Sequence, residues 1–156
     1  MNGYNTALVQ LPLVRESGKD RVATPADVHR VCADIADLAQ ESFHVLVLDA
    51  KNRLKTRHMV SLGLVDAALV HPREVFRCAI ESGASALVLV HSHPSGDPTP
   101  SAEDLRITRQ LIEAGKIVDI KVLDHVVIGR AVEPEGNEPG RAAFLSLRES
   151  GMVAFE

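Results

Sequence analysis

The short apolar segment Ala86–Val90 constrains the fold of this chain more than any other part of the sequence. It consists of Ala, Val and Leu, follows the turn-forming Gly83, and runs directly into His91-Ser92-His93-Pro94. The segment is too short for a buried helix, and its Val and Leu content favours a strand. A strand this apolar is covered on both faces, so we expect it at the centre of a sheet.

The segments around this strand predict an α/β domain with a mixed sheet and helices on its faces, because both hairpin and crossover connections are expected. Thr24 is a typical N-cap with Pro25 as the first helical residue. The predicted helices begin at Pro25, near Pro72 and near Ala102, and they end near Ala39, before Gly83 and at Ala114 before Gly115. The predicted strands are Thr6–Val14, Phe43–Asp49, Leu54–Leu62, Ile117–Ile128 (one strand or a pair) and a short one within Phe144–Val153.

We expect one globular domain at residues 24–156, preceded by an N-terminal strand and extension at residues 1–23. The composition, with 46% hydrophobic and 24% charged residues, is typical of such a domain. Glu133–Arg141 contains two Pro, two Gly and three Glu residues, which predicts a mobile surface loop.

Charge and cysteine content limit the possible partners. A formal net charge of −4 gives no general attraction for phosphate backbones, so we do not expect this domain alone to bind nucleic acid. Cys32 and Cys78 are too isolated to suggest a disulfide framework, which favours the cytoplasm. No apolar run is long enough for a membrane span, and no signal peptide is recognisable. The oligomeric state is not predicted.

The histidine pair at the end of the central strand is the strongest candidate site. Side chains in a strand alternate between faces, so His91 and His93 point to the same side, as two ligands of one metal must. Pro94 ends the strand, and a Gly- and Pro-containing loop leads to a helix that begins near Asp104. Two His and one Asp leave one position of a tetrahedral zinc ion open for water, which is the arrangement of a catalytic site.

Each part of this pattern also has a structural interpretation. Ser101 and Asp104 match a capping box, in which both side chains only satisfy helix amides. The His-x-His pair alone is more often a satisfied polar pair. His125 is interpreted as a buried, hydrogen-bonded residue outside the site, and His44 as a surface or half-buried one.

Taken together, His91-Ser92-His93-Pro94, Ser101 and Asp104 resemble the signature of the JAB/MPN domains, also called JAMM metalloproteases. The wider context, including the sequences His71–Phe76 and Leu123-Asp124-His125, resembles the RadC-like bacterial branch. This branch usually has Asn at the position of Ser92. It also generally carries an N-terminal helix-hairpin-helix module, for which the residues before Thr24 are too few.

The resemblance implies a JAB/MPN-type fold, a cytidine-deaminase-like layered domain, with one Zn²⁺ per chain. It implies that His91, His93 and Asp104 bind zinc, that Ser101 supports the oxyanion, and that Glu41 is the general base. From the residues alone, other glutamates were equally available as the base, namely Glu74, Glu81, Glu103 and Glu113.

Two functions follow from this pattern. The first is a zinc-dependent metallohydrolase, a peptidase or isopeptidase that acts on a peptide or protein conjugate through a metal-activated water. The alternative is a non-catalytic or DNA-repair-associated RadC-like module that retains a metal site. A cytidine deaminase site is excluded because it needs a Pro-Cys-x-x-Cys motif, which Cys32 and Cys78 do not form.

Overall fold

The computed structural model describes residues 20–63 and 70–155, and in these ranges it confirms the predicted α/β fold. The strands are β1 (Ser42–Leu48), β2 (Leu54–Leu62), β3 (Ala86–Ser92), β4 (Lys121–Ile128) and β5 (Phe144–Ser146). The helices are α1 (Pro25–Val31), the 3₁₀ helix η1 (Ala33–Asp37), α2 (Pro72–Glu81) and α3 (Ala102–Val118). The strand predicted at Thr6–Val14 lies outside the described residues.

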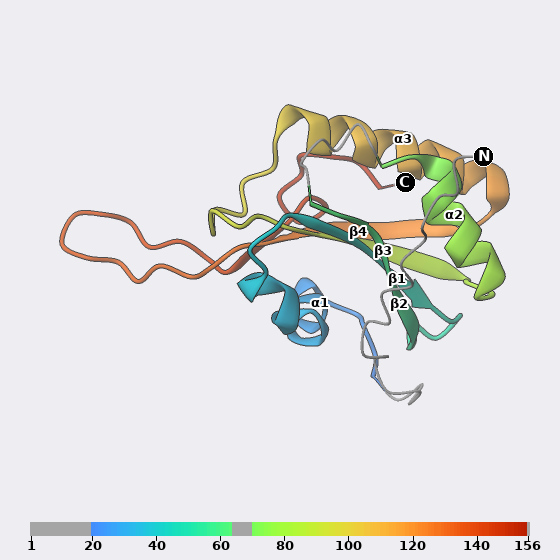
Figure 1. Cartoon of the computed structure of the whole chain (residues 1–156), viewed down its shortest axis with the longest axis horizontal. Helices are drawn as coiled ribbons and strands as arrows, with labels where there is room; N and C mark the ends of the chain where they lie inside the picture. Colours follow the sequence, from blue (N-terminus) through green and yellow to red (C-terminus); the bar gives the residue numbers. More distant parts are fainter. Residues whose placement is uncertain (1–19, 64–69, 156) are drawn as a thin grey trace, which may run out of the picture.

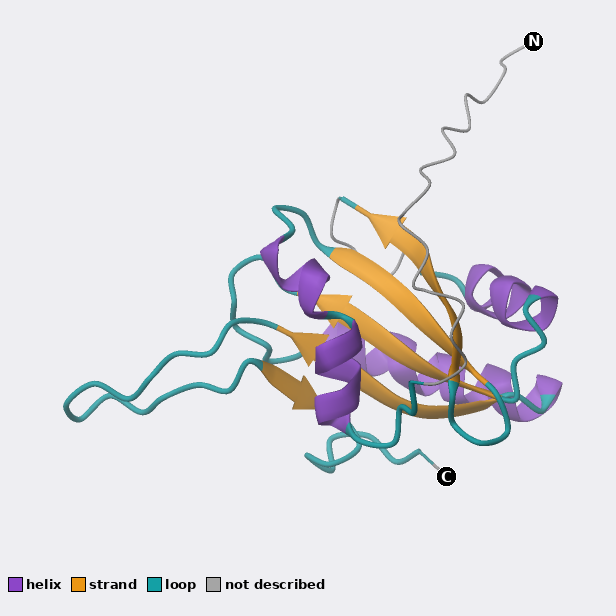
Figure 2. Ribbon diagram, turned by 90° about the horizontal axis from the view of Figure 1, so that it is seen from below, coloured by secondary structure: helices purple, strands orange, loops and turns teal. Residues whose placement is uncertain are grey.

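The strands form one mixed sheet in the order β2-β1-β3-β4-β5. β3 lies at its centre, antiparallel to β1 and parallel to β4, as the apolar sequence of β3 predicted. The β3–β4 connection is a crossover through α3, whereas β1 and β2 form the predicted hairpin. Figures 1 and 2 show α2 and α3 on one face of the sheet and α1 on the other.

Each face of the sheet has its own apolar core, because alternate side chains of the central strands point to opposite sides. Leu87 and Leu89 of β3 pack with α2 and α3, whereas Val88 and Val90 pack with α1 and η1. All seven residues of β3 are buried. In the described part of the chain, no helix combines the length and the apolar character that a membrane span requires.

The first predicted helix is shorter than its periodicity suggested. A capping box between Thr24 and Asp27 starts α1, but regular helix ends at Val31. Cys32 leaves helical geometry at φ −114° and ψ 17°, and the chain continues as η1, whose Ile35 still faces the sheet. The apolar spacing therefore continues through a change of helix type.

The third helix is longer than predicted. It passes through Gly115 and ends at Val118, followed by Asp119 in the left-handed conformation at φ 56°. The strand predicted from Ile117 therefore begins only at Lys121. Gly115 is inside the helix because the returning chain approaches it closely: a Cβ there would lie 2.5 Å from the backbone oxygen of Ile120.

We expect Gly115→Ala to destabilise the protein by about 1–2 kcal/mol, although Ala is the better helix former. The reason is that the added methyl meets backbone, which cannot move aside without breaking the bond from Ile120 N to Gly115 O. Urea unfolding measures this change. Lys116→Ala, at an exposed neighbouring position, is the control and should shift the free energy of unfolding by less than about 0.5 kcal/mol. Equal stability of Gly115→Ala and wild type would contradict the close approach.

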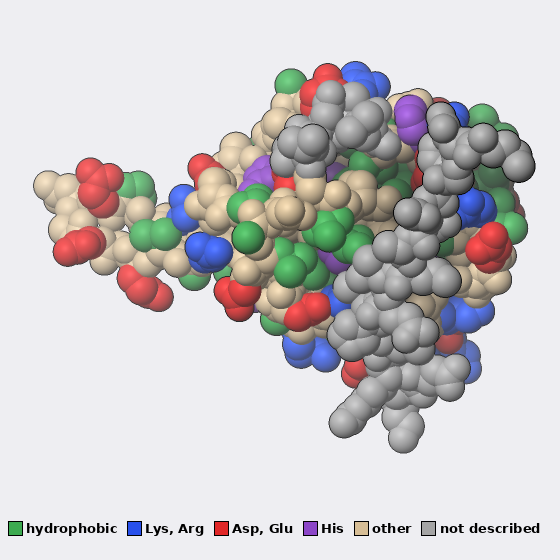
Figure 3. Space-filling view, viewed as in Figure 1, with side chains coloured by type: hydrophobic (Ala, Val, Ile, Leu, Met, Phe, Trp, Pro, Cys, Tyr) green, Lys and Arg blue, Asp and Glu red, His purple; other side chains and the backbone are tan. Residues whose placement is uncertain are grey.

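The predicted surface loop at Glu133–Arg141 forms a projecting arm. Isolated antiparallel bridges join Val132 to Arg141 and Glu135 to Glu138, so the segment doubles back on itself. Every residue from Arg130 to Gly140 is exposed. Figures 1 and 3 show the arm extending from the domain, with acidic side chains toward its tip and basic ones where it joins the domain.

Candidate metal centre

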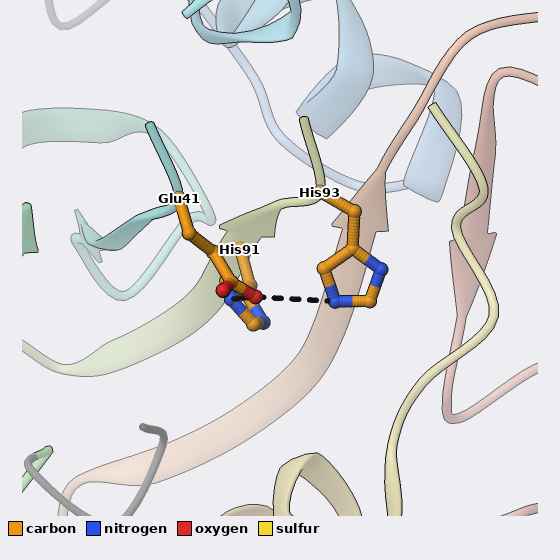
Figure 4. Close-up of side chains that lie close together, drawn as sticks. All are labelled: Glu41, His91 and His93. Carbon is orange, nitrogen blue, oxygen red and sulfur yellow. Dashed lines mark ion pairs between the residues drawn. The ribbon is translucent and has the colours of Figure 1, made fainter. Parts of the chain in front are cut away.

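The candidate site lies where the start of β1 meets the end of β3. The antiparallel register pairs Ser42 with Ser92 and Phe43 with His91. Glu41, the residue before β1, is therefore brought to the end of β3, where His91 and His93 are. Figure 4 shows the Glu41 carboxylate and the two imidazole rings pointing toward one another.

Glu41 contacts both histidines of the pair. Its Oε1 atom lies 2.5 Å from Nε2 of His91 and 3.5 Å from Nε2 of His93. The three side chains each offer one ligand atom, and these atoms all lie within 4.8 Å of one another. Glu41, His91 and His93 could therefore hold a metal ion.

Asp104 approaches the same histidines from the first turn of α3. Its Oδ1 atom lies 3.2 Å from Nδ1 of His91, and its Oδ2 atom lies 3.3 Å from Nε2 of His93. Its side chain is 2% exposed. The site thus has two carboxylates, one from each side, and Asp104 faces a different nitrogen of His91 than Glu41 does.

The capping interpretation of Ser101 and Asp104 is confirmed. Ser101 Oγ accepts from the Asp104 amide at 3.1 Å, and Asp104 Oδ2 accepts from the Ser101 amide at 2.8 Å. Capping and metal chemistry are compatible, because the cap places the Asp104 carboxylate against the histidines. It uses only a lone pair of Ser101 Oγ, and the hydroxyl proton stays able to donate.

The loop after β3 orients His93. Its Nδ1 atom lies 2.8 Å from the backbone oxygen of Asp97, which accepts the ring proton and leaves Nε2 for the site. The loop itself is held at Gly96, whose oxygen accepts from Arg130 N at 2.7 Å. Gly129 permits this approach, since a Cβ there would lie 2.1 Å from the Gly96 oxygen. The base of the arm thus fixes the loop.

The two carboxylates favour a cation between the histidines. Burial lowers the pKa of His91, but Asp104 and Glu41 outweigh it and raise that pKa to about 9. Burial raises the pKa of Asp104, and the contacts with His91 and His93 overcome this and hold it well below its usual range. Without a metal, a proton on His91 balances the carboxylates, so a metal ion would compete with that proton.

The metal-free protein should therefore lose stability as the pH rises. The pKa of His91 is about 9 in the folded protein and about 6.5 when unfolded, so its contribution is complete below pH 6.5 and lost by about pH 9. The shift corresponds to a loss of up to about 3 kcal/mol. Denaturant unfolding in the presence of a chelator at pH 6 and pH 9 measures it. His91→Gln should remove the difference, and a wild type equally stable at both pH values would refute it.

The other predicted or available residues lie elsewhere. Ion pairs hold the glutamates that were alternatives to Glu41, joining Glu74 to Arg73, Glu103 to Arg106 and Glu113 to Lys116. Glu81 is exposed at the end of α2. Of these candidates, it is Glu41 that the structure brings to the histidines.

The prediction for His125 is confirmed. It is fully buried, and its Nδ1 atom lies 2.5 Å from Oγ1 of Thr108. The expectation for His44 was wrong: it is 1% exposed, with Nε2 2.9 Å from Ser42 Oγ. Ser42 Oγ in turn lies 2.8 Å from Ser92 Oγ, so these hydroxyls join β1 to β3 behind the histidines.

Sequence reasoning did not identify Ser42, His44 or Thr108 as neighbours of the site. The strand period gives one usable signal, because Ser42 and His44 are two residues apart and so share a face. Thr108 is four residues after Asp104 on α3 and thus shares its side of the helix. Neither signal indicates which strand or helix the residues meet.

Comparison with known proteins adds an independent result. The sequence profile of the RadC-like JAB domain family matches residues 22–151. The chain is 46% identical over 136 residues to a UPF0758 protein of Caldanaerobacter subterraneus subsp. tengcongensis, covering 86% of this chain and 54% of that protein.

Two further UPF0758 proteins show similar identity. The protein of Desulforamulus reducens is 44% identical, with 93% of this chain and 64% of that protein covered. The protein of Listeria monocytogenes serovar 1/2a is 42% identical, with 91% and 59% covered. The matches thus span between 54% and 64% of the length of these three relatives.

Proposed function

Because this chain belongs to the family of RadC-like JAB domains, we propose that it is a zinc-dependent metallohydrolase that cleaves an amide or isopeptide bond. The observation that carries the proposal is the convergence of two imidazoles and two carboxylates at one end of the sheet. One carboxylate is available as a ligand while the other remains free for proton transfer.

The donor set fits zinc. Imidazole nitrogens and carboxylate oxygens are ordinary zinc ligands, and three protein ligands leave a position open for chemistry. We assign His91, His93 and Asp104 as the ligands, with one ion per chain. When bound, the metal would polarise the substrate carbonyl and lower the pKa of a water molecule.

Glu41 is proposed as the general base. Its side chain is 11% exposed, so it is accessible from the site while held against His91. It takes a proton from the attacking water as the new C–O bond forms. It then passes that proton to the leaving amine as the C–N bond breaks, so the carboxylate is regenerated.

Ser101 is proposed to support the oxyanion. Its exposed side chain lies at the start of α3, next to the Asp104 carboxylate. A hydroxyl donor at this point stabilises negative charge on the carbonyl oxygen more than it stabilises the neutral substrate.

A peptide or a protein conjugate is the proposed substrate. The chain matches only part of its longer relatives, so the substrate of a whole protein of this family is a separate question. Cys32 and Cys78 are free thiols, which fits the proposed location in the reducing cytoplasm.

The test is to incubate the zinc-loaded protein with peptide and isopeptide libraries and to identify products by mass spectrometry. The proposal expects cleavage that a chelator abolishes and added zinc restores. Binding of about one zinc per chain without cleavage of any amide or isopeptide would instead favour the non-catalytic, DNA-repair-associated module.

A further inference from the structure

We propose that Thr108 and His125 position the His91 imidazole for the metal. In this proposal, one buried water forms hydrogen bonds with both Nδ1 of His91 and Nε2 of His125 and so bridges the two rings. This inference rests on the metal site proposed above. It concerns how a ligand ring is held, and it makes His125 and Thr108 positioning residues rather than catalytic ones.

Two buried nitrogen atoms with unused hydrogen-bonding capacity lie on the same face of the sheet. Among the described residues, Nδ1 of His91 and Nε2 of His125 are buried and have no hydrogen-bond partner. Oδ1 of Asp104 lies 3.2 Å from Nδ1 of His91 and forms an ion-pair contact with it, but the two atoms do not form a hydrogen bond. Buried polar atoms are rarely left unpaired, because their desolvation is costly.

The hydroxyl of Thr108 decides which His125 nitrogen carries the proton. Thr108 Oγ1 donates its only proton to the backbone oxygen of Asp104 at 2.6 Å. Towards His125 it must therefore accept, so Nδ1 of His125 is protonated and Nε2 is an acceptor. Burial lowers the pKa of His125 to about 3, which keeps the ring neutral at physiological pH.

His91 has the complementary need. A ring that gives the Nε2 lone pair to a metal carries its proton on Nδ1, and ligand histidines almost always donate that second N–H. His93 does so to the backbone oxygen of Asp97. Among the described residues, no acceptor forms a direct hydrogen bond with Nδ1 of His91. In our proposal, Nε2 of His125 is that acceptor, reached through the bridging water.

The two rings are neighbours on this face of the sheet. The centroids of His91 and His125 are 6.2 Å apart, and the rings are inclined by 32°. The two nitrogen atoms form no direct hydrogen bond with each other, so the contact that we propose between them is a bridging water. Phe43 packs against both rings, with centroids 5.9 Å from His91 and 5.5 Å from His125, and closes the apolar side of the contact.

The decisive variant is Thr108→Val, which keeps the shape of the side chain and removes the hydroxyl. We expect it to weaken zinc affinity by about 10–100-fold, the usual effect of losing an outer hydrogen-bond partner. Thr108→Ser, which retains the hydroxyl, should bind zinc like wild type. Affinity is measured by competition with a chelator, and circular dichroism checks that each variant folds.

Two further measurements separate positioning from packing. Ile107→Val removes one buried methyl from the adjacent position of α3 and should leave zinc affinity unchanged. Nitrogen NMR of the imidazoles should find His125 protonated on Nδ1 in wild type and no longer fixed in that form in Thr108→Val. His125→Phe should weaken zinc binding as Thr108→Val does.

Wild-type affinity and an unchanged His125 tautomer in Thr108→Val would overturn the inference while leaving the metal site intact. Equal weakening in Thr108→Val, Thr108→Ser and Ile107→Val would also overturn it, since the effect would then be one of packing. A wild-type protein that binds no zinc would overturn the proposed function as well.

Discussion

Glu41→Gln is expected to leave about one zinc ion bound per chain and to lower kcat by about 10²–10⁴-fold, the usual contribution of a general acid–base residue. The amide keeps the size of the side chain and an oxygen beside Nε2 of His91, but it cannot accept the proton of the attacking water. Zinc content is measured by elemental analysis, and kcat on any substrate that the library experiment identifies.

Glu74→Gln is the matched control for this change. Glu74 is also a partly buried glutamate, but it pairs with Arg73 on α2 and should leave both zinc content and kcat unchanged. Full activity in Glu41→Gln would remove Glu41 from the mechanism. Loss of zinc from Glu41→Gln would make Glu41 a ligand, as its contacts with His91 and His93 also permit.

Asp104→Asn is expected to lower zinc content to less than about one-tenth of an ion per chain, with hydrolysis lost in parallel, because one of three charged or imidazole donors is replaced by a weak neutral one. Asn can still accept from the Ser101 amide, so the start of α3 should be preserved. This substitution therefore separates the metal role of Asp104 from its capping role, whereas Asp104→Ala would remove both roles at once.

Asp27→Asn provides the comparison for Asp104→Asn. Asp27 occupies the same position in the capping box of α1, where its partner is Thr24 rather than a histidine. The Asp27→Asn protein should bind zinc as the wild type does. If Asp104→Asn retains zinc while Glu41→Gln loses it, the third ligand is Glu41 and Asp104 orients His91.

The features that could be predicted from the sequence depend on neighbours in the chain. The strand Ala86–Ser92 follows from an apolar run, and the shared side of His91 and His93 from the two-residue period of a strand. The start of α3 follows from the capping box of Ser101 and Asp104. The predicted end of α3 was wrong, because Gly115 is required by the close approach of Ile120 and does not terminate the helix.

The sequence by itself determined the histidine pair, the carboxylate that follows it and the strand and helix that carry them, because local periodicity and capping act within a few residues. For Glu41, the sequence offered only a resemblance, and its place beside His91 depends on the register of β1 against β3, two strands about fifty residues apart. Only the tertiary structure decided that register, because burial of alternate side chains in two separate cores allows no shift by one residue. The same packing brings Thr108 and His125 next to His91, and no spacing in the sequence indicates that these residues are neighbours.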